Sequence, residues 1–175
     1  RSGIIAITLG AGDELLNARF VEKGDEVILA TARGQSIRFK ESDIREMGRA
    51  AGGVRAIKLK KSDVVIGASR VKKEDAMARF LVMSENGYGK ATLVKEYKVQ
   101  RRGGSGIKTA KVTPKTGKVM TSRILSAEEE IVAISKNGQV IRIESKEVPT
   151  QGRQTQGVRI MKLREGDKIA SLTCL

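Results

Sequence analysis

The sequence predicts an all-β fold built from repeated four-stranded units, arranged like the blades of a propeller. A block that begins with glycine recurs about every 50 residues, and a strand–turn–strand pattern recurs at the same period. Helical periodicity is weak throughout, and only residues 41–47 favour a single short helical turn. Repeats of ~40–50 residues that each hold about four strands are typical of propeller blades.

The glycine-initiated blocks begin at Gly3, Gly53, Gly106 and Gly157, at intervals of 50, 53 and 51 residues. Each block continues with apolar residues and is expected to form a strand. We therefore expect residues 1–175 to be a fragment of a single repeat domain, with repeats starting near residues 3, 53, 106 and 157. An ordinary β-sandwich with accidental internal similarity is the alternative, and four copies in register disfavour it.

Three hairpins are predicted, with turns at Gly34, Gly87 and Gly138 that lie 53 and 51 residues apart. Asn86-Gly87 and Asn137-Gly138 are dipeptides that two-residue hairpins prefer. Each unit is expected to hold one further strand ahead of its hairpin. These strands are expected at residues 15–20, 64–69 and 119–124, with an end strand at 168–175.

The composition is that of a basic globular protein. Lys and Arg number 34 against 20 Asp and Glu, which gives a net charge of +14 and an isoelectric point near 10.2. Such a balance is the electrostatic footprint of nucleic-acid binding. No membrane partner is expected, because no apolar run approaches the ~20 residues of a bilayer span and no basic amphipathic helix is predicted. Because the chain begins at Arg1, in mid-pattern, we expect it to be part of a longer protein.

Several catalytic chemistries are excluded within this chain. It has no histidine, and Cys174 is its sole cysteine, so histidine-based triads, histidine-ligated zinc and internal disulfides are ruled out. A tyrosine hydroxyl can attack a phosphodiester, but Tyr88 and Tyr97 fall in a predicted hairpin and a predicted strand, without an acidic metal cluster nearby. We expect no catalytic residue and no metal site, and we interpret Glu128-Glu129-Glu130 as a solvated loop.

The most informative stretch is Gln100-Arg101-Arg102-Gly103-Gly104-Ser105-Gly106, a tight loop with two cations. Arginine offers forked donors that match phosphate oxygens, and glycine lets the backbone approach a partner closely. An arginine stands four residues before the block glycine in three repeats, at Arg49, Arg102 and Arg153. A turn that merely solvates its arginines is the alternative, but recurrence at one position of each repeat favours a shared function.

Loops that recur in each unit of a propeller would line one rim and form a track for a duplex backbone. We hypothesise sequence-independent duplex DNA binding along that rim, with cationic side chains as phosphate donors and glycines as close-approach points. The predicted DNA-binding residues are Gln100, Arg101, Arg102, Gly103, Gly104, Ser105, Gly106, Arg49, Arg153, Arg38, Lys90 and Arg142.

At these residues the chain resembles the C-terminal domain of DNA gyrase A, over nearly all of its length. Residues 100–106 are similar to the family's box Gln-Arg-Arg-Gly-Gly-Lys-Gly, with Ser105 where the family usually has lysine. Met47-Gly48-Arg49, the run from Asn86 to Lys90 and the run from Gly152 to Val158 add to the resemblance. The similarity is to the later repeats of that domain.

The resemblance implies a β-pinwheel, a propeller-like fold in which neighbouring blades exchange a strand, here with about three to four blades. It also implies chiral wrapping of duplex DNA in support of ATP-dependent negative supercoiling by a type II topoisomerase. The partners implied are the rest of gyrase A, together with gyrase B, in a bacterial-type cytoplasm in association with the nucleoid. The catalytic tyrosine, ATP and magnesium would act outside this chain, so no cofactor is expected here.

Two alternatives stay open. The topoisomerase IV equivalent has the same fold with a degenerate or missing box, and the near-intact box favours gyrase. A protein-binding propeller would not gather its positive charge on one rim, and free DNA would not compete for its partner. If the chain is a gyrase domain, Ser105 would weaken one phosphate contact, and a box in a later repeat has the position of an auxiliary box.

Overall fold

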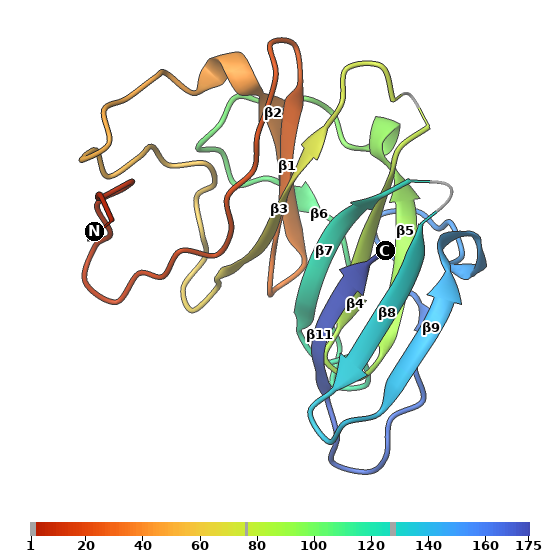
Figure 1. Cartoon of the computed structure of the whole chain (residues 1–175). Coiled ribbons are helices and arrows are strands. Elements are labelled where there is room, and N and C mark those ends of the chain that lie inside the picture. Colours follow the sequence, from red (N-terminus) through yellow and green to blue (C-terminus); the bar gives the residue numbers. More distant parts are fainter. Residues whose placement is uncertain (1–2, 76, 127–128) are drawn as a thin grey trace.

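The computed structural model describes residues 3–75, 77–126 and 129–175 (Figure 1). Strands dominate these residues, and their only helices are the single 3-10 turns η1 (Glu41–Asp43), η2 (Val94–Glu96) and η3 (Ser145–Glu147). The strands are β1 (Glu26–Thr31), β2 (Gln35–Lys40), β3 (Val65–Val71), β4 (Arg79–Ser84), β5 (Tyr88–Leu93), β6 (Ile107–Lys108), β7 (Val119–Leu125), β8 (Glu130–Ser135), β9 (Val140–Glu144), β10 (Val158–Arg159) and β11 (Ile169–Cys174). The predicted all-β class is confirmed.

The strands form three antiparallel sheets, each centred on one of the predicted hairpins. The orders are β3-β1-β2-β6, β10-β5-β4-β7 and β11-β8-β9. The hairpins β1–β2, β4–β5 and β8–β9 turn at Gly34, Gly87 and Gly138, as predicted. The flanking strands come from later in the chain, so every sheet combines strands of different repeats. This exchange between units is the pinwheel arrangement, and it makes the repeats mutually dependent.

The short outer strands carry the longest-range exchange. In the first sheet Ser36 lies opposite Ile107, and in the second Gly89 lies opposite Val158. A Cβ atom added to Gly157 would lie 2.5 Å from the carbonyl oxygen of Gly89, and Gly157 has a φ of +81°. The recurring block glycine is therefore required where the exchanged strand crosses the backbone of an earlier hairpin without room for a side chain.

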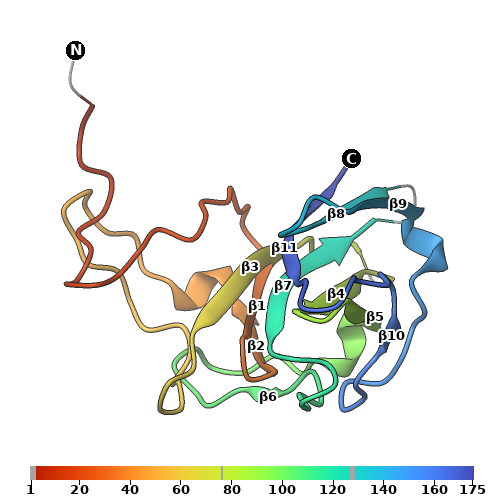
Figure 2. The same ribbon diagram turned by 90° about the horizontal axis from the view of Figure 1, so that it is seen from below.

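The core lies between the sheets, which stand side by side in Figure 2. Adjacent residues of β4 point to opposite faces: Phe80 packs in a cluster with Ile28 of β1, and Leu81 in a cluster with Ile131 of β8. Phe80 also meets the ring of Tyr97 edge to face, with centroids 5.6 Å apart. The second sheet is thus covered on both faces by its neighbours.

The N-terminal part departs from the prediction. Residues 3–9, 15–20 and 53–59 were expected as strands, but no strand forms there, and Leu15 and Phe20 are 62% and 96% exposed. The reason is the lack of a pairing partner. Strands β3, β7 and β11 each pair with the hairpin of the preceding unit, and the described residues hold no hairpin ahead of residues 15–20. Residues 3–22 accordingly run outside the sheets (Figure 2).

Tyr97 also lies elsewhere than predicted. It follows η2 instead of lying in a strand, is 1% exposed, and shares a hydrogen bond of 2.6 Å with the hydroxyl of Thr109. It is a core residue. No helix in the described ranges is long and apolar enough to cross a membrane.

Candidate nucleic-acid interface

The loop of residues 100–106 lies along the irregular segment of residues 56–58. The amide of Gly103 donates to the carbonyl of Ala56 over 2.7 Å, and the carbonyl of Gly104 accepts from the amide of Lys58 over 2.8 Å. Gly103 and Gly106 have φ values of +83° and +69°, which suit glycine. Backbone bonds on both sides therefore fix the loop before any side chain is considered.

The two arginines of this loop have different environments. Arg102 donates from Nε to the carbonyl of Asp43 over 3.0 Å and from Nη1 to the carbonyl of Arg55 over 2.9 Å. It is half-buried, whereas Arg101 and Ser105 are exposed. Arg102 therefore braces the loop, and its remaining N–H groups and the whole of Arg101 are available to an outside acceptor.

The third repeat shows the same brace. Arg153 donates from Nη1 to the carbonyl of Lys108 over 3.2 Å, and Lys108 stands at the position that Arg55 holds one unit earlier. Like Arg102, Arg153 is half-buried, so the predicted equivalence of these two arginines extends to their contacts. Arg49 is exposed at the corresponding place in the N-terminal unit.

Lys90 is buried beneath the loop that carries Arg153. Its side chain is 1% exposed, and its Nζ donates to the carbonyls of Gly152 and Arg153, the latter over 2.6 Å. Burial lowers the pKa of Lys90 to about 8, and the positive charge of Arg153 acts in the same direction. Lys90 therefore positions the backbone that carries Arg153 and does not face solvent.

Arg38 and Arg142 are both tied to carboxylates across their hairpins. Arg38 pairs with Glu26 and also donates from Nη1 to the carbonyls of Val94 and Tyr97, over 2.8 and 3.0 Å. Arg142 pairs with Glu130, and its side chain stays 66% exposed. Gln100, whose amide donates to the carbonyl of Arg38 over 2.8 Å, is half-buried. The charges of Arg38 and Arg142 are therefore largely balanced by these carboxylates.

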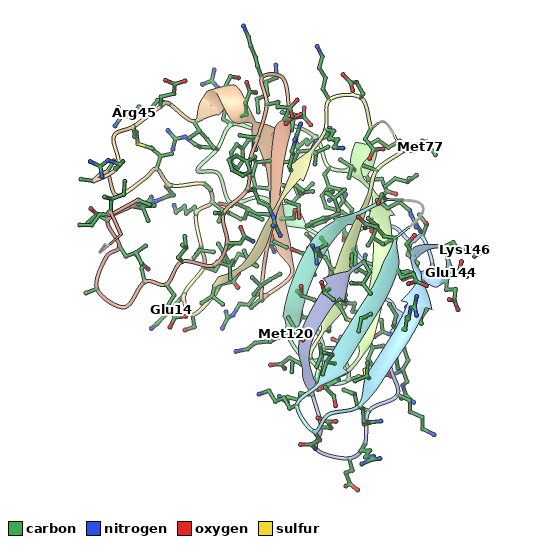
Figure 3. The ribbon with its side chains drawn as sticks, in the orientation of Figure 1. Glu14, Arg45, Met77, Met120, Glu144 and Lys146 are labelled. Carbon is green, nitrogen blue, oxygen red and sulfur yellow. The ribbon has the colours of Figure 1, made fainter. Side chains whose placement is uncertain are left out.

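Exposed cations also occur away from these loops. Arg45 projects outward after η1 in Figure 3, two residues beyond the carbonyl that Arg102 holds. Lys146, in η3, forms an ion pair with Glu144 at the end of β9 instead (Figure 3). The residue type alone therefore does not separate free cations from paired ones.

The sequence did not single out a second cationic group, around Tyr88. Arg159 donates from Nη2 to the Tyr88 hydroxyl over 3.1 Å, and its guanidinium and the Lys115 ammonium lie 5.6 and 5.4 Å from the ring centroid. The hydrogen bond from Arg159 lowers the pKa of Tyr88, and Lys115 adds to this effect. The recurrence of a cation two residues after three of the four block glycines, at Arg55, Lys108 and Arg159, was a signal, but the contact of Arg159 with Tyr88 depends on strand exchange.

No metal site is visible in the described part of the chain, where no three Asp, Glu or Cys side chains gather. Glu128 of the predicted solvated loop lies outside the described residues. Taken together, hairpin-centred sheets, exchanged strands and arginine-braced loops define a propeller-type repeat domain. Comparison with known proteins then places it more closely.

The chain belongs to the family described as DNA gyrase C-terminal domain, beta-propeller, whose model matches residues 1–22, 25–72, 78–126 and 129–175. It is 37% identical over 172 residues to DNA gyrase A of Staphylococcus epidermidis (strain ATCC 12228 / FDA PCI 1200), and 36% identical to that of Staphylococcus aureus (strain MRSA252). Each alignment covers 98% of this chain and 19% of the relative. The chain therefore spans about a fifth of the length of these curated relatives.

Solved structures agree on the fold. A DNA gyrase A C-terminal domain superposes with a TM-score of 0.88 at 29% identity, over 98% of this chain and 58% of that one. The C-terminal domain of a DNA topoisomerase IV superposes with a TM-score of 0.90 at 17% identity, over 97% and 52%. The second likeness is one of fold alone.

Proposed function

We propose that this chain binds the backbone of duplex DNA in a sequence-independent way and wraps it, as the C-terminal domain of a DNA gyrase A protein. The observation that carries the proposal is the repeated brace of Arg102 and Arg153, which presents a partly exposed guanidinium at the same point of successive units. A periodic row of cations suits a polymer of regularly spaced phosphates.

The predicted site residues take two roles in this proposal. Arg101 and Arg49 contact phosphates with their whole side chains, and Arg102 and Arg153 with the donors that their braces leave free. Lys90, Arg38, Arg142 and Gln100 support the rim from within. Gly103, Gly104 and Gly106 shape the loop, and Ser105 contributes a hydroxyl where a lysine would add a charge.

Wrapping requires bending, which costs ~1–6 kcal/mol over 20–30 bp and is offset only by contacts distributed along the curve. The described helices are single turns, so direct reading of the major groove by a helix is not part of the proposal. We infer that residues 1–175 act as a fragment of one repeat domain, with repeats starting near residues 3, 53, 106 and 157. Bent duplex would then pass along their successive loops.

The larger assembly is likewise a proposal. The chain would act beside the rest of gyrase A and beside gyrase B, in a bacterial cytoplasm near the nucleoid. ATP-dependent negative supercoiling would then be the activity of the holoenzyme, with ATP and magnesium bound outside this chain. The gyrase A relatives and the near-intact box support gyrase over topoisomerase IV, and a supercoiling assay of the holoenzyme separates the two.

Duplex binding is tested by filter binding over a series of salt concentrations. Affinity should fall steeply with salt, and Arg101→Gln should lower the slope of log K against log salt by about 1. Lys146→Gln is the matched control, because it removes one positive charge from the ion pair at the end of β9. A flat salt dependence contradicts DNA binding, and a protein-binding propeller then becomes the better interpretation. Equal effects of the two variants contradict the proposed rim.

A further inference from the structure

A cavity of about 420 Å³ opens beside Tyr88. Its lining includes Arg159, which follows the Arg153 loop in the sequence. It is formed by three repeats: β5 supplies Tyr88, the turn before β7 supplies Lys115, and β10 supplies Arg159. Cations dominate its lining, which also includes Lys162, Arg164 and Lys168. Strand exchange therefore creates a positively charged hollow that no single repeat contains.

The donors in this hollow are preorganised. Because the Tyr88 hydroxyl oxygen accepts a hydrogen bond from Arg159, its own proton is free to be donated elsewhere. Tyr88 is 6% exposed, and two cations lie near its ring, so its environment restricts the position of its hydroxyl. Among the described residues, no carboxylate forms an ion pair with Lys115 or Arg159. The carboxylate of Asp167, which also lines the cavity, accepts the backbone amides of Asn137 and Lys168.

We propose that this cavity is a phosphate-binding pocket, in which the Tyr88 hydroxyl, the Arg159 guanidinium and the Lys115 ammonium hold one phosphate group. A phosphate offers several acceptor oxygens, which match a phenolic O–H, a guanidinium and an ammonium that line one cavity. If the phosphate belongs to duplex DNA, the pocket deepens the proposed function, on which that assignment rests. If it belongs to a small phosphorylated molecule, the pocket is a separate ligand site.

The first sheet provides an internal comparison. Gln35 occupies the place of Tyr88 and lies opposite Lys108, as Tyr88 lies opposite Arg159. Ser62 stands in the turn where the later unit has Lys115. The equivalent place therefore has one cation and no phenol, and the pocket is a specific feature of the second sheet. If charge alone governed phosphate binding, loss of Lys108 or of Arg159 would weaken it equally. The pocket predicts that loss of Arg159 weakens phosphate binding more.

The chain offers a direct spectroscopic probe, because it has two tyrosines and no tryptophan. In the ring-labelled chain, inorganic phosphate at constant ionic strength should shift the NMR signal of Tyr88 saturably and leave that of buried Tyr97 unchanged. Arg159→Gln should weaken this phosphate response about tenfold, the value of one charge-assisted hydrogen bond. Lys108→Gln should leave it unchanged, and an unshifted Tyr97 signal shows that either variant keeps its core.

A second arm identifies the source of the phosphate. If a short duplex shifts the same Tyr88 signal and inorganic phosphate competes with it, the pocket holds a backbone phosphate. If phosphate shifts Tyr88 but duplex does not, the pocket serves a small phosphorylated molecule. A Tyr88 signal that responds to neither, or equal effects of the two variants, overturns the pocket. Failure of the salt series with an intact phosphate response contradicts the proposed function alone.

Discussion

Individual arginines in this protein serve either as braces or as free cations, and the backbone around each decides which. Arg102 and Arg153 donate to the backbone carbonyls of Arg55 and Lys108, whereas Arg101, beside Arg102, is exposed. The sequence predicted that these residues form one series. It did not predict the braces, because the carbonyls that accept them lie about 45 residues away in sequence, at Arg55 and Lys108. The same holds for Lys90, which was expected near the surface and is buried.

Arg102→Lys tests the brace. A lysine keeps the charge but cannot reach the carbonyls of Asp43 and Arg55 with one planar fork. We expect the free energy of unfolding to fall by about 1 kcal/mol, in line with lost hydrogen bonds at a partly exposed site. Urea unfolding measures this, with Arg101→Lys as the control. An equal loss in the two variants would show that Arg102 is no brace.

Lys90 gives a pH-dependent prediction. Its pKa falls from the usual 10.5 to about 8 on folding, so between these values the unfolded chain binds more protons than the folded one. The stability of the wild type should therefore rise with pH across this window relative to Lys90→Met, by at most about 1.4 kcal/mol per pH unit. Unfolding of both proteins from pH 7 to 11 measures it. If the difference in unfolding free energy between the two proteins stays constant over this pH range, the lowered pKa of Lys90 is contradicted.

At the level of elements, the hairpins were predictable from the sequence and the exchange was not. Turn glycines and alternating residues located β1–β2, β4–β5 and β8–β9, because hairpin contacts are local. The pairing of β6 with β2 and of β10 with β5 joins residues about 70 positions apart, which no local pattern specifies. The expected strand at 15–20 failed for the same reason, since a strand pattern forms a strand only when a partner edge is present.

Gly157→Ala and Gly138→Ala separate the exchange from turn geometry. Both glycines have a φ of +81°, so both variants carry the strain of a left-handed alanine. An added Cβ at 157 would meet the carbonyl oxygen of Gly89 at 2.5 Å, whereas at 138 it would meet nothing within 4 Å. We expect Gly157→Ala to lose at least about 1 kcal/mol more in unfolding free energy. Indistinguishable urea midpoints would contradict the close crossing of β10.

For the molecule as a whole, the positive charge and the repeats predicted a DNA-binding repeat protein. Strand exchange between the repeats links them mechanically. Each sheet shares strands with later repeats, so the loops at Arg49, residues 100–106 and Arg153 are held in a fixed order. A net charge of +14 attracts any polyanion, but only an ordered row of loops would impose one direction of bending. Directional bending is what separates wrapping from simple adhesion.

The most direct measurement is the linking number of nicked circular DNA that is ligated in the presence of this chain and then deproteinised. Chiral wrapping predicts a shift of the topoisomer distribution in one direction, growing with protein concentration and diminished in Arg101→Gln. Lys146→Gln should leave the shift intact. A distribution identical to that of DNA ligated alone, under conditions where a gel shift shows binding, would contradict wrapping.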